Sequence, residues 1–181
     1  MQVNLYSDEE LLAGCKKNKR HYQEILYRKY ARKMYGLCMS YAPERDMAQD
    51  ILQDAFIKVF NKIKDFKKDG SLEGWIRKII VNTALDHLRK QTREYRYVVD
   101  NDGDKEDECN PDAIENLKTE DVLKMVAELP EGARMVFNLH VLEGYTHKEI
   151  AEKMNITEGT SKSQFNRARK KLMILLNKFS A

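Results

Sequence analysis

The stretch THKEIAEKMNITEGTSKSQFNRARKKL, residues 146–172, contains two helix patterns joined by a tight turn. Thr146 and Glu149 have the spacing of a capping box, which starts the first helix. Asn155 suits the left-handed backbone conformation that such a turn requires, and Thr157 starts the second helix. The stretch therefore predicts a helix-turn-helix, a unit whose second helix normally enters the major groove of DNA.

The second of these helices has two different faces. Cations can neutralise phosphates, and asparagine and serine can hydrogen-bond base edges. A solvated face usually mixes both signs of charge, whereas this one has no acid after Glu158. A membrane-surface helix would need a free apolar face, and here the fold occupies that face. The apolar face consists of Phe165, Ala168, Leu172, Leu175 and Phe179, and the residues expected to face DNA are Thr160, Lys162, Ser163, Asn166, Arg167 and Lys170.

The N-terminal part of the chain predicts four helices. The capping box SDEE at residues 7–10 starts the first, and apolar residues at helical steps indicate a second over about 22–41. The third is expected to bury Ala48, Ile51, Leu52, Ala55, Phe56, Val59 and Ile63. The fourth, over about 72–93, is expected to turn Leu72, Trp75, Ile76, Ile79 and Ile80 toward the core. No segment alternates as a strand would, so the chain is predicted to be all-α.

The third helix carries polar residues opposite its apolar stripe. These residues are Asp46, Asp50, Gln53, Asp54, Ile57 and Asn61. A solvated acidic face is the simplest interpretation, but the exposed position of Ile57 favours a protein partner. Three aspartates at four-residue steps could also ligate a metal, although no second element predictably supplies further ligands. We therefore expect no metal site.

The fourth helix aligns an aromatic ring, an amide and several cations on one narrow face. Trp75, Lys78, Asn82, Asp86, Arg89 and Arg93 follow one another at three- or four-residue steps. This combination suits a nucleic-acid backbone together with a base that stacks on the ring. The alternative interpretation places Trp75 in the core and pairs Asp86 with Lys90.

Length and charge indicate two domains. The chain has 181 residues, of which 42% are hydrophobic, and its net charge is +3. Residues 100–115 contain eight acids and one lysine, so this segment resembles a flexible acidic linker between two basic domains. We expect domains over 1–96 and 119–181, joined by a linker over 97–118. The three cysteines form no CxxC pair, and no apolar run or signal pattern is present, which favours a cytoplasmic protein.

Three motifs resemble those of bacterial sigma factors of the extracytoplasmic-function (ECF) group. They are DMAQDILQDAFIKVF (46–60), GWIRKIIVNTALDHLRK (74–90) and GYTHKEIAEKMNITEGTSKSQFNRARKKL (144–172), in the order and spacing of that family. The resemblance covers about residues 9–179 and implies a four-helix sigma domain 2 followed by a helix-turn-helix sigma domain 4. Ser161 and Gln164 depart from it, because the family usually has an aliphatic residue and often an arginine there.

The resemblance implies a protein without catalysis, cofactor or membrane insertion that binds core RNA polymerase and promoter DNA. An anti-sigma factor is a further partner that many members of the family have. The residues implied for the clamp helices of the largest polymerase subunit are Asp50, Gln53, Asp54 and Ile57. Those implied for the melted −10 element are Phe66, Lys67, Ser71, Trp75, Lys78, Asn82, Arg89 and Arg93. The helix-turn-helix residues given above would read the −35 element.

Two other functions compete with this interpretation. A stand-alone helix-turn-helix regulator would bind duplex DNA, but it would leave the outer face of the third helix and the Trp75 stripe without a role. A metal-dependent nuclease could be built on Asp46, Asp50, Asp54 and Asp86. The sequence lacks the phosphate loop, the histidine pair or the activated nucleophile that such an enzyme would use.

Overall fold

The computed structural model describes residues 6–67, 70–92 and 119–179, and every element in these segments is helical. The chain divides into two compact units, Met1–Lys90 and Gln91–Ala181, called here the N-terminal and C-terminal units. The predicted linker, 97–118, and Arg93 lie outside the described residues. Among the described segments, no helix combines the length and the apolar character that a membrane span requires.

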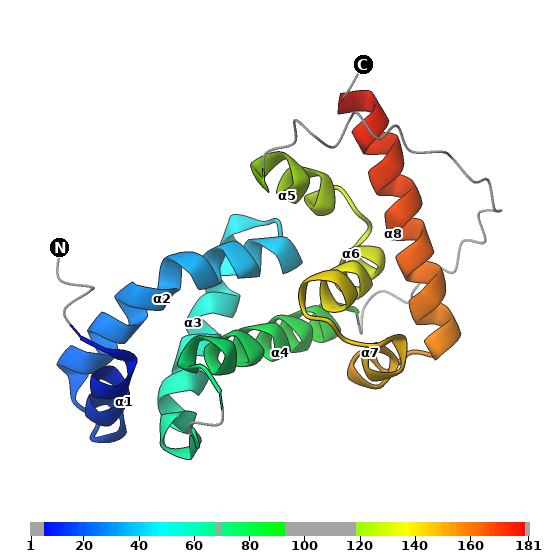
Figure 1. Cartoon of the computed structure of the whole chain (residues 1–181). Coiled ribbons are helices and arrows are strands. Elements are labelled where there is room, and N and C mark those ends of the chain that lie inside the picture. Colours follow the sequence, from blue (N-terminus) through cyan, green and yellow to red (C-terminus); the bar gives the residue numbers. More distant parts are fainter. Residues whose placement is uncertain (1–5, 68–69, 93–118, 180–181) are drawn as a thin grey trace. The chain divides into compact units, whose positions relative to one another are not determined.

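The N-terminal unit contains four α-helices and one 3-10 turn (Figure 1). They are α1 (Asp8–Lys16), α2 (Arg20–Tyr41), α3 (Arg45–Lys62), η1 (Ile63–Asp65) and α4 (Leu72–Thr92). The capping box at the start of α1 is confirmed. The Ser7 hydroxyl accepts a hydrogen bond from the Glu10 backbone N–H, and the Glu10 carboxylate accepts one from the Ser7 N–H at 2.8 Å. These hydrogen bonds hold the pKa of Glu10 below its usual value.

The core of this unit is almost entirely apolar. All seven residues predicted for the stripe of α3 are buried, and Tyr41, Leu26 and Ile80 are fully inaccessible. On α4, however, Ile79 is only partly buried, so its predicted place in the core is wrong. Trp75 is also partly buried, which favours its predicted place on the exposed stripe over the alternative place in the core. The buried face of α4 continues through Val81, Ala84, Leu85 and Leu88. Trp75 lies beside this face, where it lines a hollow described below.

The C-terminal unit contains α5 (Thr119–Ala127), α6 (Glu131–Phe137), a π-helical turn η3 (Asn138–Leu142), α7 (His147–Met154) and α8 (Glu158–Phe179). Its apolar cluster comprises Val126, Leu129, Ala133 and Ala168, with Phe137 and Leu172 packed against it. The guanidinium of Arg134 is also buried, and its Nη1 donates to the carbonyls of Ala127 and Leu129 at 3.1 and 3.0 Å. These bonds satisfy carbonyls at the end of α5 that have no helical partner.

Candidate nucleic-acid and polymerase interfaces

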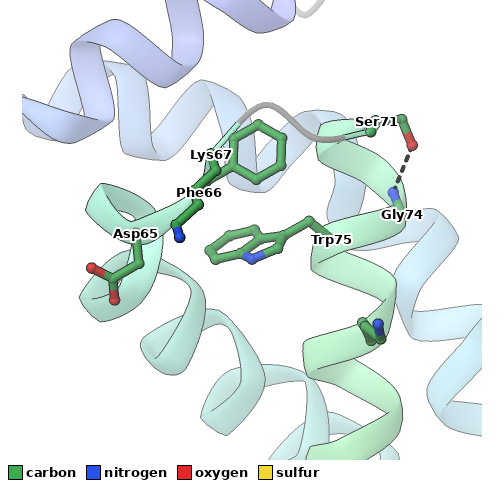
Figure 2. A pocket seen from close by; sticks show the side chains of 8 residues that line it. Asp65, Phe66, Lys67, Ser71, Gly74 and Trp75 are labelled. Carbon is green, nitrogen blue, oxygen red and sulfur yellow. Dashed lines mark hydrogen bonds between the residues drawn. The ribbon is translucent and has the colours of Figure 1, made fainter.

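A hollow opens between the end of η1 and the first turns of α4. It has a volume of about 410 Å³, which falls within the range of about 300–1,000 Å³ that is common for sites of small molecules. Figure 2 shows the indole of Trp75 pointing into it toward the segment of Asp65 and Phe66. The hollow is lined by Asp65, Phe66, Lys67, Gly70, Ser71, Gly74, Trp75 and Lys78. It therefore contains five of the eight residues predicted for the −10 element.

The walls of this hollow are held by local interactions. The rings of Phe66 and Trp75 are 5.4 Å apart at an angle of 52°, so two neighbouring aromatic residues line the hollow. On the other side, the Ser71 hydroxyl accepts a hydrogen bond from the Gly74 N–H at 3.0 Å, drawn as a dashed line in Figure 2. Gly70 has a φ of +122°, a conformation that side chains rarely adopt, and it lets the chain turn into α4.

The predicted stripe on α4 continues from this hollow as far as the structure describes side chains. Lys78, Asn82, Asp86 and Arg89 are all exposed. Asp86 pairs with Lys58 of α3 and with Arg89, at 3.3 and 3.6 Å, instead of the Lys90 of the alternative interpretation. The one acid in the stripe is therefore offset by two cations, and the stripe remains suited to a phosphate backbone.

The polar face of α3 is exposed along its whole length, as predicted. Ile57 lies in the middle of this face and, at 59%, is the most exposed large hydrophobic side chain among the described residues. The Asp54 carboxylate accepts a hydrogen bond from His87 Nε2 of α4 at 2.8 Å. Within the residues that the structure describes, no three His, Cys, Asp or Glu side chains are grouped as metal ligands would be.

The helix-turn-helix of the C-terminal unit has the predicted local geometry. Thr146 and Glu149 form both bonds of a capping box, and Asn155 adopts the left-handed conformation with φ 55° and ψ 47°. The Thr157 hydroxyl accepts a hydrogen bond from the Thr160 N–H at 3.0 Å and so caps the start of α8.

The predicted −35 residues lie on the outer side of α8 with different exposures. Lys162, Ser163 and Asn166 are exposed, whereas Thr160, Arg167 and Lys170 are partly buried. Glu158, the last acid before this face, pairs with Lys162 at 2.7 Å. The pair holds the pKa of Glu158 below its usual value. Beyond this turn the face has the predicted positive charge.

Two histidines under α8 form a polar cluster that the sequence reasoning missed. The rings of His140 and His147 stack 4.6 Å apart, and Phe165 contacts both of them edge-on. His147 Nδ1 hydrogen-bonds the hydroxyl of the fully buried Ser161 at 3.0 Å, and His140 Nδ1 donates to the Tyr145 carbonyl at 2.8 Å. Burial, followed by the neighbouring His140 and Lys162, lowers the pKa of His147. The unusual serine at 161 was the signal that could have indicated this cluster.

Comparisons with known proteins match both units. The family model of sigma-70 region 2 matches residues 26–94, and that of sigma-70 region 4 matches residues 119–172. The first match includes α3 and the hollow, and the second includes the helix-turn-helix.

Several relatives match nearly the whole chain. The ECF RNA polymerase sigma-E factor of Escherichia coli K12 is 29% identical over 175 residues, which are 90% of this chain and 91% of the relative. The RNA polymerase sigma-H factor of Pseudomonas aeruginosa is 27% identical over 176 residues, or 90% of each chain. Among solved structures, the sigma factor RpoE of Bartonella quintana, in complex with the anti-sigma factor NepR, has a TM-score of 0.51 and 26% identity. That match covers 88% of this chain and 98% of the other.

Proposed function

This chain belongs to the sigma-70 family, within its ECF group. From that premise we propose which of its residues direct RNA polymerase to promoters. As an ECF sigma factor it binds core RNA polymerase and promoter DNA and starts transcription at specific sites. The observation that carries the residue assignment is the hollow between Phe66 and Trp75, because a stand-alone regulator of duplex DNA has no use for it.

In the N-terminal unit, the hollow receives a base that has left the −10 duplex. Extraction of a base costs a few kcal/mol, and stacking on an aromatic ring returns about 1–3 kcal/mol per base. Trp75 supplies the ring, while Lys78, Asn82 and Arg89 on the exposed side of α4 follow the strand. Lys67 and Ser71, which line the same hollow, contact the captured nucleotide.

In the C-terminal unit, α8 enters the major groove of the −35 element. Ser163 and Asn166 are exposed and can hydrogen-bond base edges, while Lys162, Arg167 and Lys170 supply positive charge for phosphates. Thr160, in the first turns of α8, lies where a groove-bound helix approaches the DNA backbone. The segment 97–118 joins the two units, so binding of one raises the effective concentration of the other.

The exposed face of α3 binds the clamp helices of the polymerase through Asp50, Gln53, Asp54 and Ile57. An exposed isoleucine among acids can supply apolar contact within a charged interface. Because this function uses chromosomal DNA and needs no chemistry by the chain itself, we assign the protein to the cytoplasm and to no enzyme class. Because the similar RpoE was solved with an anti-sigma factor, an anti-sigma factor is a further partner to test for.

Replacement of two aspartates separates polymerase binding from DNA binding. The variant Asp50→Ala with Asp54→Ala should bind core polymerase about tenfold more weakly, because charged groups at an interface contribute to encounter and affinity. Co-purification and titration with labelled core polymerase measure this. The stability of the fold should remain, since both side chains are exposed.

A suitable control is Glu152→Ala on α7, another exposed acid, which should bind core polymerase as the unchanged chain does. If the double variant binds core polymerase normally, the assignment of the α3 face is wrong. If the unchanged chain binds duplex promoter DNA but no core polymerase, the stand-alone regulator is the better interpretation.

A further inference from the structure

A residue of α1, far from the hollow in the sequence, contacts one of its walls. Lys16 is the last residue of α1, and its Nζ donates a hydrogen bond of 2.9 Å to the backbone carbonyl of Phe66. Phe66 forms one wall of the hollow, and its side chain is 7% exposed. A cationic donor makes a stronger bond to a carbonyl than a neutral one does, and this bond is partly shielded from water.

The helix that carries Lys16 is itself firmly fixed. The Asp8 carboxylate at its start accepts hydrogen bonds from Lys29 Nζ at 2.7 Å and from the Tyr30 hydroxyl at 2.8 Å, both on α2. Leu11 and Cys15 on the same helix are fully buried. Because α1 is tied to α2 along its length, the ammonium of Lys16 is held at a defined position relative to the core.

The two walls of the hollow are therefore attached to different parts of the unit. The Trp75 wall belongs to α4, whose start is closed by the Ser71–Gly74 hydrogen bond. The Phe66 wall follows η1 and is bonded to α1 through Lys16. The separation of the two rings, 5.4 Å between centroids, depends on both attachments. A change at Lys16 can alter this separation without removing any residue that lines the hollow.

We propose that Lys16 is a positioning residue for base capture: it fixes the Phe66 wall and so sets which base the hollow accepts. This inference rests on the proposed function of the hollow. Lys16 is not among its lining residues and acts through the Phe66 carbonyl. The rival role for a surface lysine is a direct contact with a DNA phosphate, which would strengthen binding to every sequence equally.

The experiment uses holoenzyme reconstituted from the full chain and core polymerase. The probe is a forked promoter DNA in which the −10 strand is single-stranded and the captured position carries each of the four bases in turn. Lys16→Met keeps the aliphatic stem but removes the donor, Lys16→Arg restores a cationic donor, and Lys17→Met removes the neighbouring exposed lysine. Trp75→Ala tests the hollow itself.

For Lys16→Met we expect the preference for the best base over the others to fall about threefold to tenfold, the range that corresponds to the net contribution of one ordinary hydrogen bond. The salt dependence of binding should stay unchanged, Lys16→Arg should recover most of the preference, and Lys17→Met should behave like the unchanged chain. Equal weakening for all four bases, with a salt slope shallower by about one unit, would identify a phosphate contact and overturn the inference.

Unchanged preference in Lys16→Met would overturn it as well. The two proposals fail differently: if Trp75→Ala binds the fork normally, the hollow is not the capture site and both proposals fall. If Trp75→Ala weakens binding while Lys16→Met has no effect, only the role of Lys16 is lost. Urea unfolding of each variant shows whether the unit has kept its stability.

Discussion

The two surfaces proposed to bind DNA in this sigma factor are built in opposite ways. The N-terminal unit offers a concave site, lined by the rings of Phe66 and Trp75 together with Lys67 and Lys78. The C-terminal unit offers the convex outer side of α8, with exposed cations and amides and its apolar residues turned inward. An extracted base presents a flat apolar surface, whereas an intact duplex presents phosphates and base edges. Each surface therefore fits a different state of the promoter.

The buried cores of the two units also differ, in how many polar side chains they contain. Buried residues of the N-terminal unit are almost all apolar, with Ser40 and Thr83 as small exceptions. Among the described residues of the C-terminal unit, fewer apolar side chains are buried, and Arg134, Asn138 and Ser161 are buried as well. Where fewer apolar residues are buried, specific polar bonds contribute a larger share of the stability. The comparison predicts that single polar substitutions affect the C-terminal unit most.

The largest effect is expected at Arg134. Arg134→Met keeps the volume but leaves the carbonyls of Ala127 and Leu129 without their donor, and it should lower the free energy of unfolding of the C-terminal unit by about 2–4 kcal/mol. Circular dichroism during urea unfolding measures this. Trp75 is the single tryptophan, so its fluorescence reports the N-terminal unit, whose transition should not move.

Arg169→Met, an exposed position on α8, is the matched control and should change stability by no more than about 0.5 kcal/mol. If Arg134→Met and this control are equally stable, the polar bonds of the smaller core do not carry the share of stability assigned to them.

The second largest effect is expected when the Trp75 ring is removed from the hollow. Trp75→Ala should weaken binding of the melted −10 strand by about 1–3 kcal/mol, because one base loses its stacking partner. Binding of duplex −35 DNA should be unchanged. Fluorescence anisotropy with forked and duplex probes checks both statements, and Trp75→Phe should keep most of the affinity. Equal losses on the two probes would mean that the ring supports folding and not capture.

We expect two kinds of residue on the outer side of α8: residues that select the DNA sequence, and residues that strengthen binding to any sequence. Asn166→Ala should relax the preference at one position of the −35 element by about 1–3 kcal/mol, since an asparagine can make two bonds to an adenine edge. Lys170→Ala should weaken binding evenly across sequences and make the salt slope shallower by about one unit. Selection from a randomised −35 pool measures both. Exchanged phenotypes would mean that α8 docks in another orientation.

The smallest effect concerns pH. The pKa of His147 lies below its ordinary value of 6.5, chiefly because burial disfavours the charged ring. Between that value and the lowered one, the unfolded chain binds a proton that the folded unit does not. The stabilising contribution is therefore complete above about pH 6.5 and is lost as the pH falls below it.

Thermal unfolding of the C-terminal unit should accordingly occur at lower temperature at pH 5 than at pH 7. His147→Gln should reduce this dependence, while His21→Gln in the N-terminal unit should not. An unchanged pH dependence in His147→Gln would assign the effect to other groups.

Local chemistry is what the sequence predicted best. The capping boxes at Ser7 and Thr146 and the left-handed turn at Asn155 depend on residues within a few positions of one another, and the structure has all three. The stripe of α3 also followed directly from helical periodicity. For these features the side chain and its partner occur in one short segment, so their spacing determines the geometry.

Contacts between distant segments were beyond such reasoning. Ile79 was assigned to the core because it is apolar, and Trp75 was left between the core and the exposed stripe, although the packing of α4 favours the face of Val81 and Leu85. The bond from Lys16 to Phe66 and the stack of His140 on His147 join different elements, and their geometry depends on how helices pack. Helical spacing indicated the stripe that begins at Trp75, and the family resemblance indicated the loop from Phe66 to Ser71 as the place of a flipped-out base. Neither predicted the contact between the Phe66 and Trp75 rings, which depends on how η1 packs beside α4.

The central claim is that the chain gives core RNA polymerase promoter specificity through two dissimilar surfaces. The most direct test is transcription in vitro with core polymerase from the same bacterium on fragmented genomic DNA, followed by mapping of the RNA 5′ ends. The account predicts discrete start sites that appear only with the chain present and share two upstream sequence elements. It also predicts that Trp75→Ala loses these starts while retaining binding to the isolated −35 duplex. Transcripts that begin at the same positions with and without the chain, in a reaction where core polymerase is active, would contradict it.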